Sequence, residues 1–307
     1  MAAYDTPPKR SPIGIVAGGG VLPDELAKAL SKNQTPFFVA TIKDETTASF
    51  DPAVSSAFTW GEIGKILKYF KSNNCGELVL LGQITKRPEF TSIIGDSGTM
   101  RLLPKIVTAM TGGDDSLLSK VIKLIENEGF SVINMEKIAP ELFLTEGHYA
   151  GPKFPKKLGG ELTQALAALK DMGKHDVGQA LVIENGRIIA VEGAEGTDAM
   201  LERVASLRVS KRISQKSKNG FLVKMTKAGQ DRRVDLPTIG PNTVINTAAA
   251  GLVGIVGEAG SVLLAERDKI KDLAKANKVF LIGHKACLLY TSPSPRDLST
   301  SRMPSSA

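Results

Sequence analysis

The chain has 307 residues, of which 42% are hydrophobic and 23% charged, a composition typical of a globular protein of about two domains. Its formal net charge of +7 allows an anionic partner, but aromatic residues make up only 5% of the chain, which argues against a nucleic-acid interface. No apolar run reaches the roughly 20 residues that span a bilayer, and the polar N-terminus does not predict a secretory signal. Two cysteines, Cys75 and Cys287, predict neither a disulfide framework nor a zinc site, so we expect a cytoplasmic protein.

The first half of the chain alternates short apolar runs with helical patterns. The apolar runs that predict strands are residues 13–17, 37–42, 77–81 and 130–134. The patterns that predict helices are residues 22–30, 65–70, 102–110 and 116–128. Strands and helices in this alternation are typical of a parallel, doubly wound sheet with right-handed crossovers. We expect this domain to cover residues 12–138.

The second half of the chain has a different pattern. Residues 139–160 are rich in Pro, Gly and Lys, which predicts a linker or hinge. A predicted helix at 161–172 is followed by two strands, 180–184 and 188–192, which Asn185-Gly186 would join as a hairpin. The remaining predicted elements are a helix at 198–207, strands at 221–225 and 279–283, and apolar segments at 248–251 and 262–264. Residues 161–286 therefore predict a mixed α/β domain with an antiparallel component.

The last residues, 287–307, do not continue this pattern. They are rich in Ser and Pro and lack periodicity, which predicts a disordered tail. The run 287–297 resembles the translation of a transposase-based sequencing adaptor, and 301–307 resembles the flow-cell end of the same adaptor. We therefore expect the natural sequence to be interrupted near Ala286, and we base no interpretation of fold or function on this segment.

A glycine-rich turn, Gly18-Gly19-Gly20, lies between the first predicted strand and the first predicted helix. A nucleotide-binding turn belongs at this place, because glycines let the backbone approach a phosphate and the helix start offers N–H groups. Pro23 stands where the dinucleotide fingerprint has its third glycine, and no clear acidic residue closes the second strand. We therefore expect no nicotinamide cofactor, and a tight strand-to-helix turn without any ligand stays an equal alternative.

Residues 224–237 gather charges just after an apolar strand. The basic residues are Lys224, Lys227, Arg232 and Arg233. Cations there would neutralise phosphate oxygens, and carboxylates spaced like Asp231 and Asp235 could hold a divalent ion. A solvated charged loop is the alternative.

A third cluster, residues 192–198, again joins a strand to a helix. Thr197 or Asp198 could cap that helix, and Glu195 and Asp198 would face a site only if their loop points toward residues 224–237. The three histidines have no partner at metal-ligand spacing. Neither a Cys–His pair nor G-x-S-x-G is present, so we expect no covalent nucleophile.

Six motifs, taken in order, resemble one family. They are GIVAGGGVLP (14–23), GQITKRP (82–88), GDDSLL (113–118), DVGQALVIENG (176–186), EGTDAM (195–200) and KAGQDRRVDLPTIGPNT (227–243). Over residues 12–284 the chain is similar to the LpxI-type UDP-2,3-diacylglucosamine diphosphatases. The resemblance implies an N-terminal Rossmann-like domain, a C-terminal α/β domain, and a substrate bound between them. It also implies hydrolysis to UMP and 2,3-diacylglucosamine 1-phosphate, in lipid A biosynthesis, with a divalent cation that is usually Mg²⁺.

The resemblance also implies roles for individual residues. Asp231 would be the family's essential aspartate and Asp235 the second acid of its motif, and both are expected to bind the metal. By their charge, Lys224, Lys227, Arg232 and Arg233 are candidates to orient the diphosphate, and only some of them can point inward. The residues expected near the substrate are Gly18, Gly19, Gly20, Leu22, Gln83, Glu195, Thr197, Asp198 and Gln230. A water activated by the metal would then displace UMP without a covalent intermediate.

Two other functions stay open from the sequence. A nucleotide-sugar transferase would use the same glycine-rich turn, and it would keep its turnover without a divalent cation. A non-enzymatic nucleotide-binding or nucleic-acid-binding module would bind polyanions with steep salt dependence, although Asp231 and Asp235 would repel a phosphate backbone. The acyl chains of the substrate and the positive charge also predict peripheral contact with the cytoplasmic face of the inner membrane.

Overall fold

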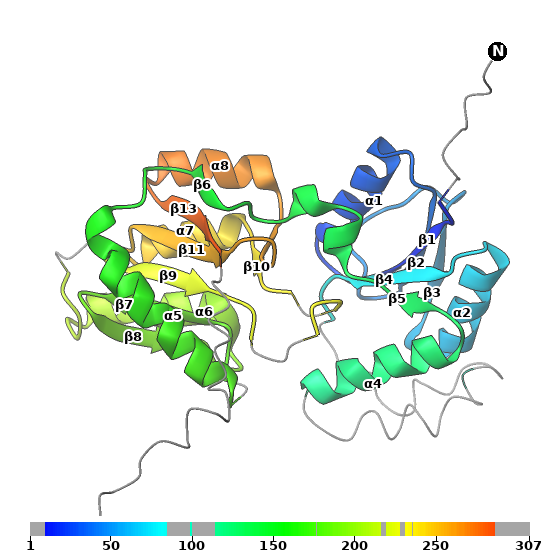
Figure 1. Ribbon diagram of the computed structural model, residues 1–307, viewed down its shortest axis with the longest axis horizontal. Coiled ribbons are helices and arrows are strands. Elements are labelled where there is room, and N and C mark those ends of the chain that lie inside the picture. The colour runs from blue at the N-terminus through cyan, green and yellow to red at the C-terminus, as the bar shows by residue number, and fades with distance from the viewer. Residues whose placement is uncertain are drawn as a thin grey trace, which may run out of the picture.

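In the computed structural model of the protein, the residues described are 10–84, 99, 114–175, 177–215, 219–227, 231–234 and 236–285, without the side chains of 114–118. They form two lobes, each built around its own sheet (Figure 1). The predicted helix at 102–110, the site residues Gln230 and Asp235, and the tail 287–307 lie outside the described residues.

The first lobe contains five described strands in the order β3-β2-β1-β4-β5, all parallel. The strands are β1 (Ile13–Ala17), β2 (Phe37–Ile42), β3 (Ser55–Phe58), β4 (Glu77–Leu81) and β5 (Ser131–Val132). The helices are α1 (Leu22–Lys32), α2 (Ile63–Ser72) and α4 (Asp114–Asn127). This arrangement confirms the doubly wound parallel sheet, and its winding reverses between β1 and β4. Ligands in such sheets bind beyond the carboxyl ends of the strands at the reversal.

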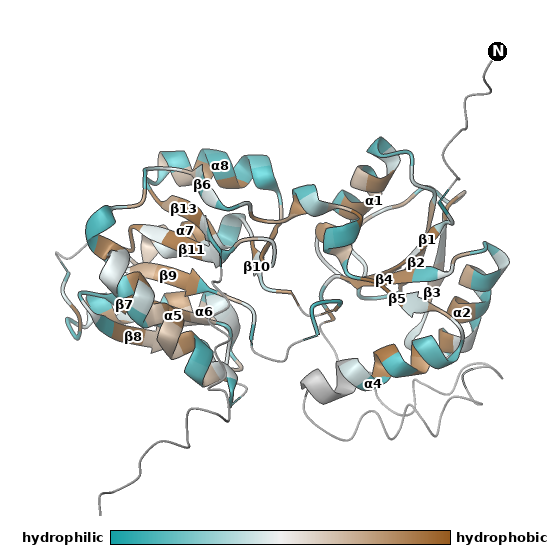
Figure 2. Ribbon diagram, in the orientation of Figure 1, coloured by the Kyte–Doolittle hydropathy of each residue, from teal (hydrophilic) through white to brown (hydrophobic). Residues whose placement is uncertain are grey.

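The strands of the first lobe bury side chains on both faces. Ile13, Ile15 and Val39 pack with α1 on one face, whereas Ala40 and Leu78 pack with α2 and α4 on the other. Near-continuous apolar runs are what a doubly covered parallel strand requires, and β1 and most of β4 are correspondingly apolar (Figure 2). Strand β3, with the sequence SSAF, was not predicted because half of it is polar.

The second lobe contains six described strands in the order β6-β13-β11-β9-β7-β8. The strands are β6 (Gly147–Ala150), β7 (Ala180–Glu184), β8 (Arg187–Val191), β9 (Phe221–Lys224), β11 (Gly254–Glu258) and β13 (Phe280–His284). β9, β11 and β13 are parallel, while β6 pairs with β13 and β7 pairs with β8 and β9 in antiparallel fashion. The mixed sheet is as predicted, and Asn185 and Gly186 both have positive φ, as the hairpin turn requires.

Four helices of the described chain cover this second sheet. They are α5 (Gly159–Gly173), α6 (Gly196–Val209), α7 (Pro241–Ala249) and α8 (Arg267–Ala276). Buried residues of α6, α7 and α8 pack on one face, and α5 packs on the other with Phe221 and Phe280. Segment 139–160, predicted as a linker, contributes β6 to this sheet because β6 pairs with β13. The short 3₁₀ helices are η1 (Trp60–Glu62), η3 (Met135–Lys137), η4 (Pro140–Leu142) and η5 (Lys156–Leu158).

A small parallel pair, β10 (Thr238–Ile239) with β12 (Leu263–Leu264), brings the second lobe against the first. Leu263 is buried in the apolar core of the first lobe, and Leu236 packs against the same core. The backbone N–H of Glu266 also donates to Glu25 of α1 over 2.8 Å, and burial raises the pKa of that carboxyl group. The two lobes therefore share part of their interior. Among the described residues, we find no helix long and apolar enough to cross a membrane.

Candidate active site

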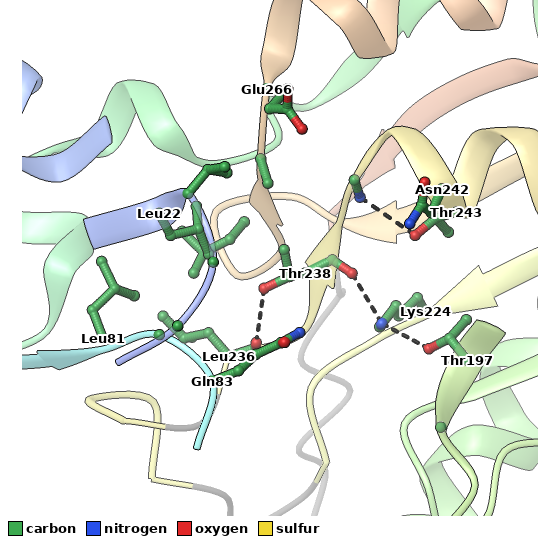
Figure 3. A pocket seen from close by; sticks show the side chains of 18 of the residues that line it. Leu22, Leu81, Gln83, Thr197, Lys224, Leu236, Thr238, Asn242, Thr243 and Glu266 are labelled. Carbon is green, nitrogen blue, oxygen red and sulfur yellow. Dashed lines mark hydrogen bonds between the residues drawn. The ribbon is translucent and has the colours of Figure 1, made fainter. Parts of the chain in front are cut away.

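A cleft of about 730 Å³ has walls from both lobes. The first lobe contributes the loops after β1 and β4, at the reversal of the first sheet, and the second contributes residues around β9, β10 and the helix starts (Figure 3). Its lining includes these predicted site residues: Gly19, Gly20, Leu22, Gln83, Glu195, Thr197, Asp198, Lys224 and Arg233. Three predicted residues that the structure describes, Gly18, Lys227 and Asp231, are not part of the lining.

The glycine-rich turn binds its neighbouring loop tightly. Gly19 and Gln83 exchange two backbone hydrogen bonds, of 2.8 and 2.9 Å, and the N–H of Gly18 donates to Leu81. A Cβ atom on Gly18 would lie 2.6 Å from the carbonyl oxygen of Gln83, so the close approach of the two loops requires glycine. The N–H of Gly20 donates to the hydroxyl of Thr47. All three glycine N–H groups thus bond within the protein, as in a tight turn, and direct substrate contact by these glycines stays a prediction.

Among the described helices, four begin at the cleft. The residues immediately before α1, α6, α7 and α8 all line it, namely Val21, Glu195, Gly240 and Glu266. The first N–H groups of a helix have no partner within the helix, and its dipole places partial positive charge there. Two of these residues are glutamates, of which Glu195 pairs with Arg203 at 2.7 Å. Hydrogen bonds from backbone N–H groups hold the pKa of Glu195 below its usual range. Helix starts can bind an anion through these N–H groups, and Glu195 and Glu266 bring negative charge to the same cleft.

Lys224 ends strand β9 and is buried in the wall of the cleft. Its ammonium group donates to the hydroxyl of Thr197 over 2.8 Å and to the carbonyl oxygen of Thr238 over 2.9 Å (Figure 3). Thr197, at the start of α6, donates its own proton to the buried carboxylate of Glu192 over 2.6 Å. The lysine therefore contributes a fixed positive charge to the cleft, and Thr197 is a bridge between two buried charges.

Arg233 lines the cleft from the segment that follows β9. Two carboxylates hold its guanidinium group. Its guanidinium group binds both oxygens of Asp231, at 2.8 and 2.6 Å, and a carboxylate oxygen of Glu126 on α4 at 2.7 Å. These hydrogen bonds from Arg233 hold the pKa of Asp231 below its usual range and raise the pKa of Arg233. The predicted catalytic aspartate thus faces an arginine, and that arginine joins the two lobes.

Hydrogen bonds to Glu258 and Ser261 also hold the segment that carries Asp231 in place. Glu258, at the end of β11, accepts hydrogen bonds from the backbone and hydroxyl of Thr226, and Arg232 donates to the buried hydroxyl of Ser261. The sequence made Arg232 a candidate to bind the diphosphate. Its side chain instead contacts Ser261, and Arg232 is not part of the cleft lining.

The described residues include only part of the divalent-cation site that the sequence predicts. Among them, no three His, Cys, Asp or Glu side chains lie close enough together to hold a metal. Both oxygens of Asp231 accept hydrogen bonds from Arg233, and the predicted second ligand, Asp235, lies outside the described residues. The Mg²⁺ site stays a prediction.

Several cleft residues were not predicted from the sequence. They are Gln179, Thr238, Asn242, Thr243 and Glu266. Gln179 stands out, because its side-chain oxygen is buried without a hydrogen-bond partner. Its place in the motif DVGQALVIENG could have identified it, whereas Glu266 reaches the cleft only through the packing of α8.

Comparisons with known proteins agree over the whole of this architecture. Residues 12–142 match the family model described as the LpxI N-terminal domain, and residues 145–282 match the LpxI C-terminal domain. The chain is also 35% identical over 271 residues to the UDP-2,3-diacylglucosamine pyrophosphatase LpxI of Caulobacter vibrioides. That alignment covers 88% of this chain and 96% of the relative.

Proposed function

This chain belongs to the LpxI family, and from that premise we propose that it is a hydrolase of UDP-2,3-diacylglucosamine in lipid A biosynthesis. The products would be UMP and 2,3-diacylglucosamine 1-phosphate. The observation that carries the proposal is the cleft itself, where helix starts from both lobes and the buried ammonium of Lys224 converge. A diphosphate is the part of this substrate that helix starts and a fixed ammonium group can bind.

In the proposed reaction, the oxygen of a water molecule bonds to one phosphorus of the diphosphate. The bond from that phosphorus to the bridging oxygen breaks, and the electron pair leaves with the departing phosphate. Negative charge grows on the phosphoryl oxygens during this step. Lys224 and the helix N–H groups are held in place before the reaction begins, so they stabilise that charge without reorganising.

Arg233 and Asp231 would act as an exchangeable pair. A phosphate oxygen competes with Asp231 for the Arg233 guanidinium, because both are anionic acceptors of the same bidentate donor. Once Arg233 binds the phosphate, the Asp231 carboxylate is released from the guanidinium group and can accept a proton from the attacking water.

The family resemblance adds a divalent cation, which Asp231 and Asp235 would help to bind. When bound, Mg²⁺ would offset phosphate charge and lower the pKa of a coordinated water.

The test is UMP release from UDP-2,3-diacylglucosamine by the full chain, measured with Mg²⁺ and with EDTA. We expect Mg²⁺-dependent release, and we expect Asp231→Ala to lower turnover by about 10²–10⁴-fold with at most a small loss of thermal stability. Full turnover in EDTA would overturn the metal requirement. Full turnover in Asp231→Ala would overturn the role of the aspartate, and no release from folded protein would overturn the proposed function.

Peripheral contact with an anionic membrane is a secondary proposal, supported by the net charge of +7. We expect the protein to sediment with phosphatidylglycerol vesicles at low salt and to be released at high salt. Absence of sedimentation at low salt would contradict it.

A further inference from the structure

Glu192 follows strand β8 and is buried behind the cleft wall. It does not line the cleft, whereas its partner Thr197 and the next partner Lys224 both do. The order of contacts from inside to outside is therefore carboxylate, hydroxyl, ammonium, with hydrogen-bond distances of 2.6 and 2.8 Å.

The threonine hydroxyl can satisfy both neighbours in only one orientation. A hydroxyl has a single proton to donate, and its remaining lone pairs accept. The Glu192 carboxylate can only accept and the Lys224 ammonium can only donate, so the proton of Thr197 must point to Glu192 and its lone pair to Lys224. Glu192 thereby fixes one of the acceptors that hold the lysine, and it supplies a negative charge close to a buried positive one.

The position of Glu192 is itself fixed by its surroundings. Its second carboxylate oxygen accepts the backbone N–H of Gln179 over 2.9 Å. A Cβ atom on the adjacent Gly178 would lie 2.1 Å from the carbonyl oxygen of Glu192 and 2.9 Å from its Cβ, so glycine at this position lets the two strand ends meet. This packing leaves Glu192 little freedom to turn away from Thr197.

We infer that Glu192 is a positioning residue for Lys224, acting through Thr197. It holds the ammonium group at the cleft wall before the substrate arrives, an inference that rests on the proposed role of the cleft in binding a diphosphate. Preorganised charge stabilises a developing anion more effectively than a charge that must first be brought into place. Neutralising Glu192 should therefore impair catalysis when Lys224 is present and have little effect when Lys224 has been replaced.

The test is a double-mutant cycle with Glu192→Gln and Lys224→Met, measured as kcat/KM for UMP release. Residues that act as one unit show non-additive effects. We expect Glu192→Gln to cost about 10-fold or more in the wild-type background and less than about 3-fold in the Lys224→Met background. Equal losses in both backgrounds would overturn the inference, because Glu192 would then act independently of the lysine.

A second pair of variants tests the bridge without removing a buried charge. Thr197→Ser keeps the hydroxyl and should stay within about 3-fold of wild type, whereas Thr197→Val should lose about as much as Glu192→Gln. Wild-type activity in Thr197→Val would overturn the inference. Glu202→Gln, on the exposed face of α6, is the matched control and should have no effect. Urea unfolding of each variant shows that it is folded in the assay, and the Thr197 pair carries the test if Glu192→Gln does not fold.

Calorimetric binding of inorganic pyrophosphate separates this inference from the proposed function. We expect Glu192→Gln to weaken pyrophosphate binding in the wild-type background and not in Lys224→Met. If this holds while the wild type releases no UMP, the inference stands and the proposed hydrolysis fails. Absence of pyrophosphate binding by the wild type would overturn the inference, since no anion would then meet Lys224.

Discussion

Lys224 and Arg233 both bring positive charge to the cleft, and the structure holds them in opposite ways. Lys224 is 6% exposed, and its partners include the hydroxyl of Thr197 and the carbonyl oxygen of Thr238. The Arg233 side chain is 34% exposed, and its partners are two carboxylates from different lobes. One cation is thus built into the wall of the cleft, and the other is held by groups that compete with the substrate for it.

The difference in burial decides which contacts can change. Breaking a buried hydrogen bond leaves a polar atom without water or protein partner, at a cost of roughly 1–3 kcal/mol. An exposed ion pair contributes only about 0–1 kcal/mol and can exchange partners with solvent or ligand. The buried lysine is suited to a permanent role, and the exposed arginine is suited to a contact that switches between Asp231 and a phosphate.

The largest expected effect is the loss of the buried cation. Lys224→Met keeps the length of the side chain and removes its charge, so kcat/KM should fall by about 100-fold or more, as when a preorganised donor is lost from other active sites. Steady-state kinetics of UMP release measures it. Lys174→Met, at an exposed lysine paired with Asp171, is the matched control and should retain full activity. A loss below about 3-fold in Lys224→Met would remove the contrast between the two cations.

A smaller effect is expected at the exposed cation. Glu126→Gln removes one of the two carboxylates that compete for Arg233, so KM should fall by about 2–3-fold at low salt, and the difference should shrink at high salt. KM is compared at 50 and 300 mM salt. Glu77→Gln is the control, because it removes an exposed pair with Arg10 at the opposite end of strand β4. A raised KM would mean that Glu126 helps to present Arg233 to the substrate.

The smallest expected effect is on stability. Arg233 lowers the pKa of Asp231 in the folded protein, so their pair stabilises the fold above the ordinary aspartate pKa of about 4, and the gain is lost as the pH falls through the depressed value. Asp231→Asn should lower the free energy of unfolding at pH 7 by less than about 1 kcal/mol, since Arg233 is one-third exposed and screened. Urea unfolding at pH 7 and pH 3 measures it. A difference that is the same at both pH values would show that the ion pair is not its cause.

Much of the fold could be predicted from the sequence, because buried parallel strands are apolar throughout. β1, β2 and β4 were predicted with their observed bounds for this reason. The central strand β11 was not predicted, since two of its five residues are glycines that pack against Phe280 and Leu144. Helix α8, RDKIKDLAKA, was not predicted either, because its apolar stripe is thin and charged residues dominate its pattern.

The site was predicted less completely than the fold. Residue type and loop position indicated Lys224 and Arg233, because cations carry their chemistry locally, and the family resemblance added Thr197. Glu192 and Glu126 could not be identified in this way, since each matters through a partner that is distant in the sequence or in the other lobe. The glycines make short contacts with loops of the first lobe, and their approach to a phosphate stays a prediction.

The burial of Leu263 in the core of the first lobe has a consequence for synthesis of the chain on the ribosome. The first lobe is otherwise complete near Leu142, yet Leu263 of its core is translated about 120 residues later. At a translation rate of roughly 5–20 residues per second, an apolar surface of the nascent lobe would stay exposed for about 6–24 s until Leu263 is synthesised. A nascent chain stalled between these points should expose that surface to chaperones, and a fragment ending near residue 142 should be prone to aggregate when expressed alone.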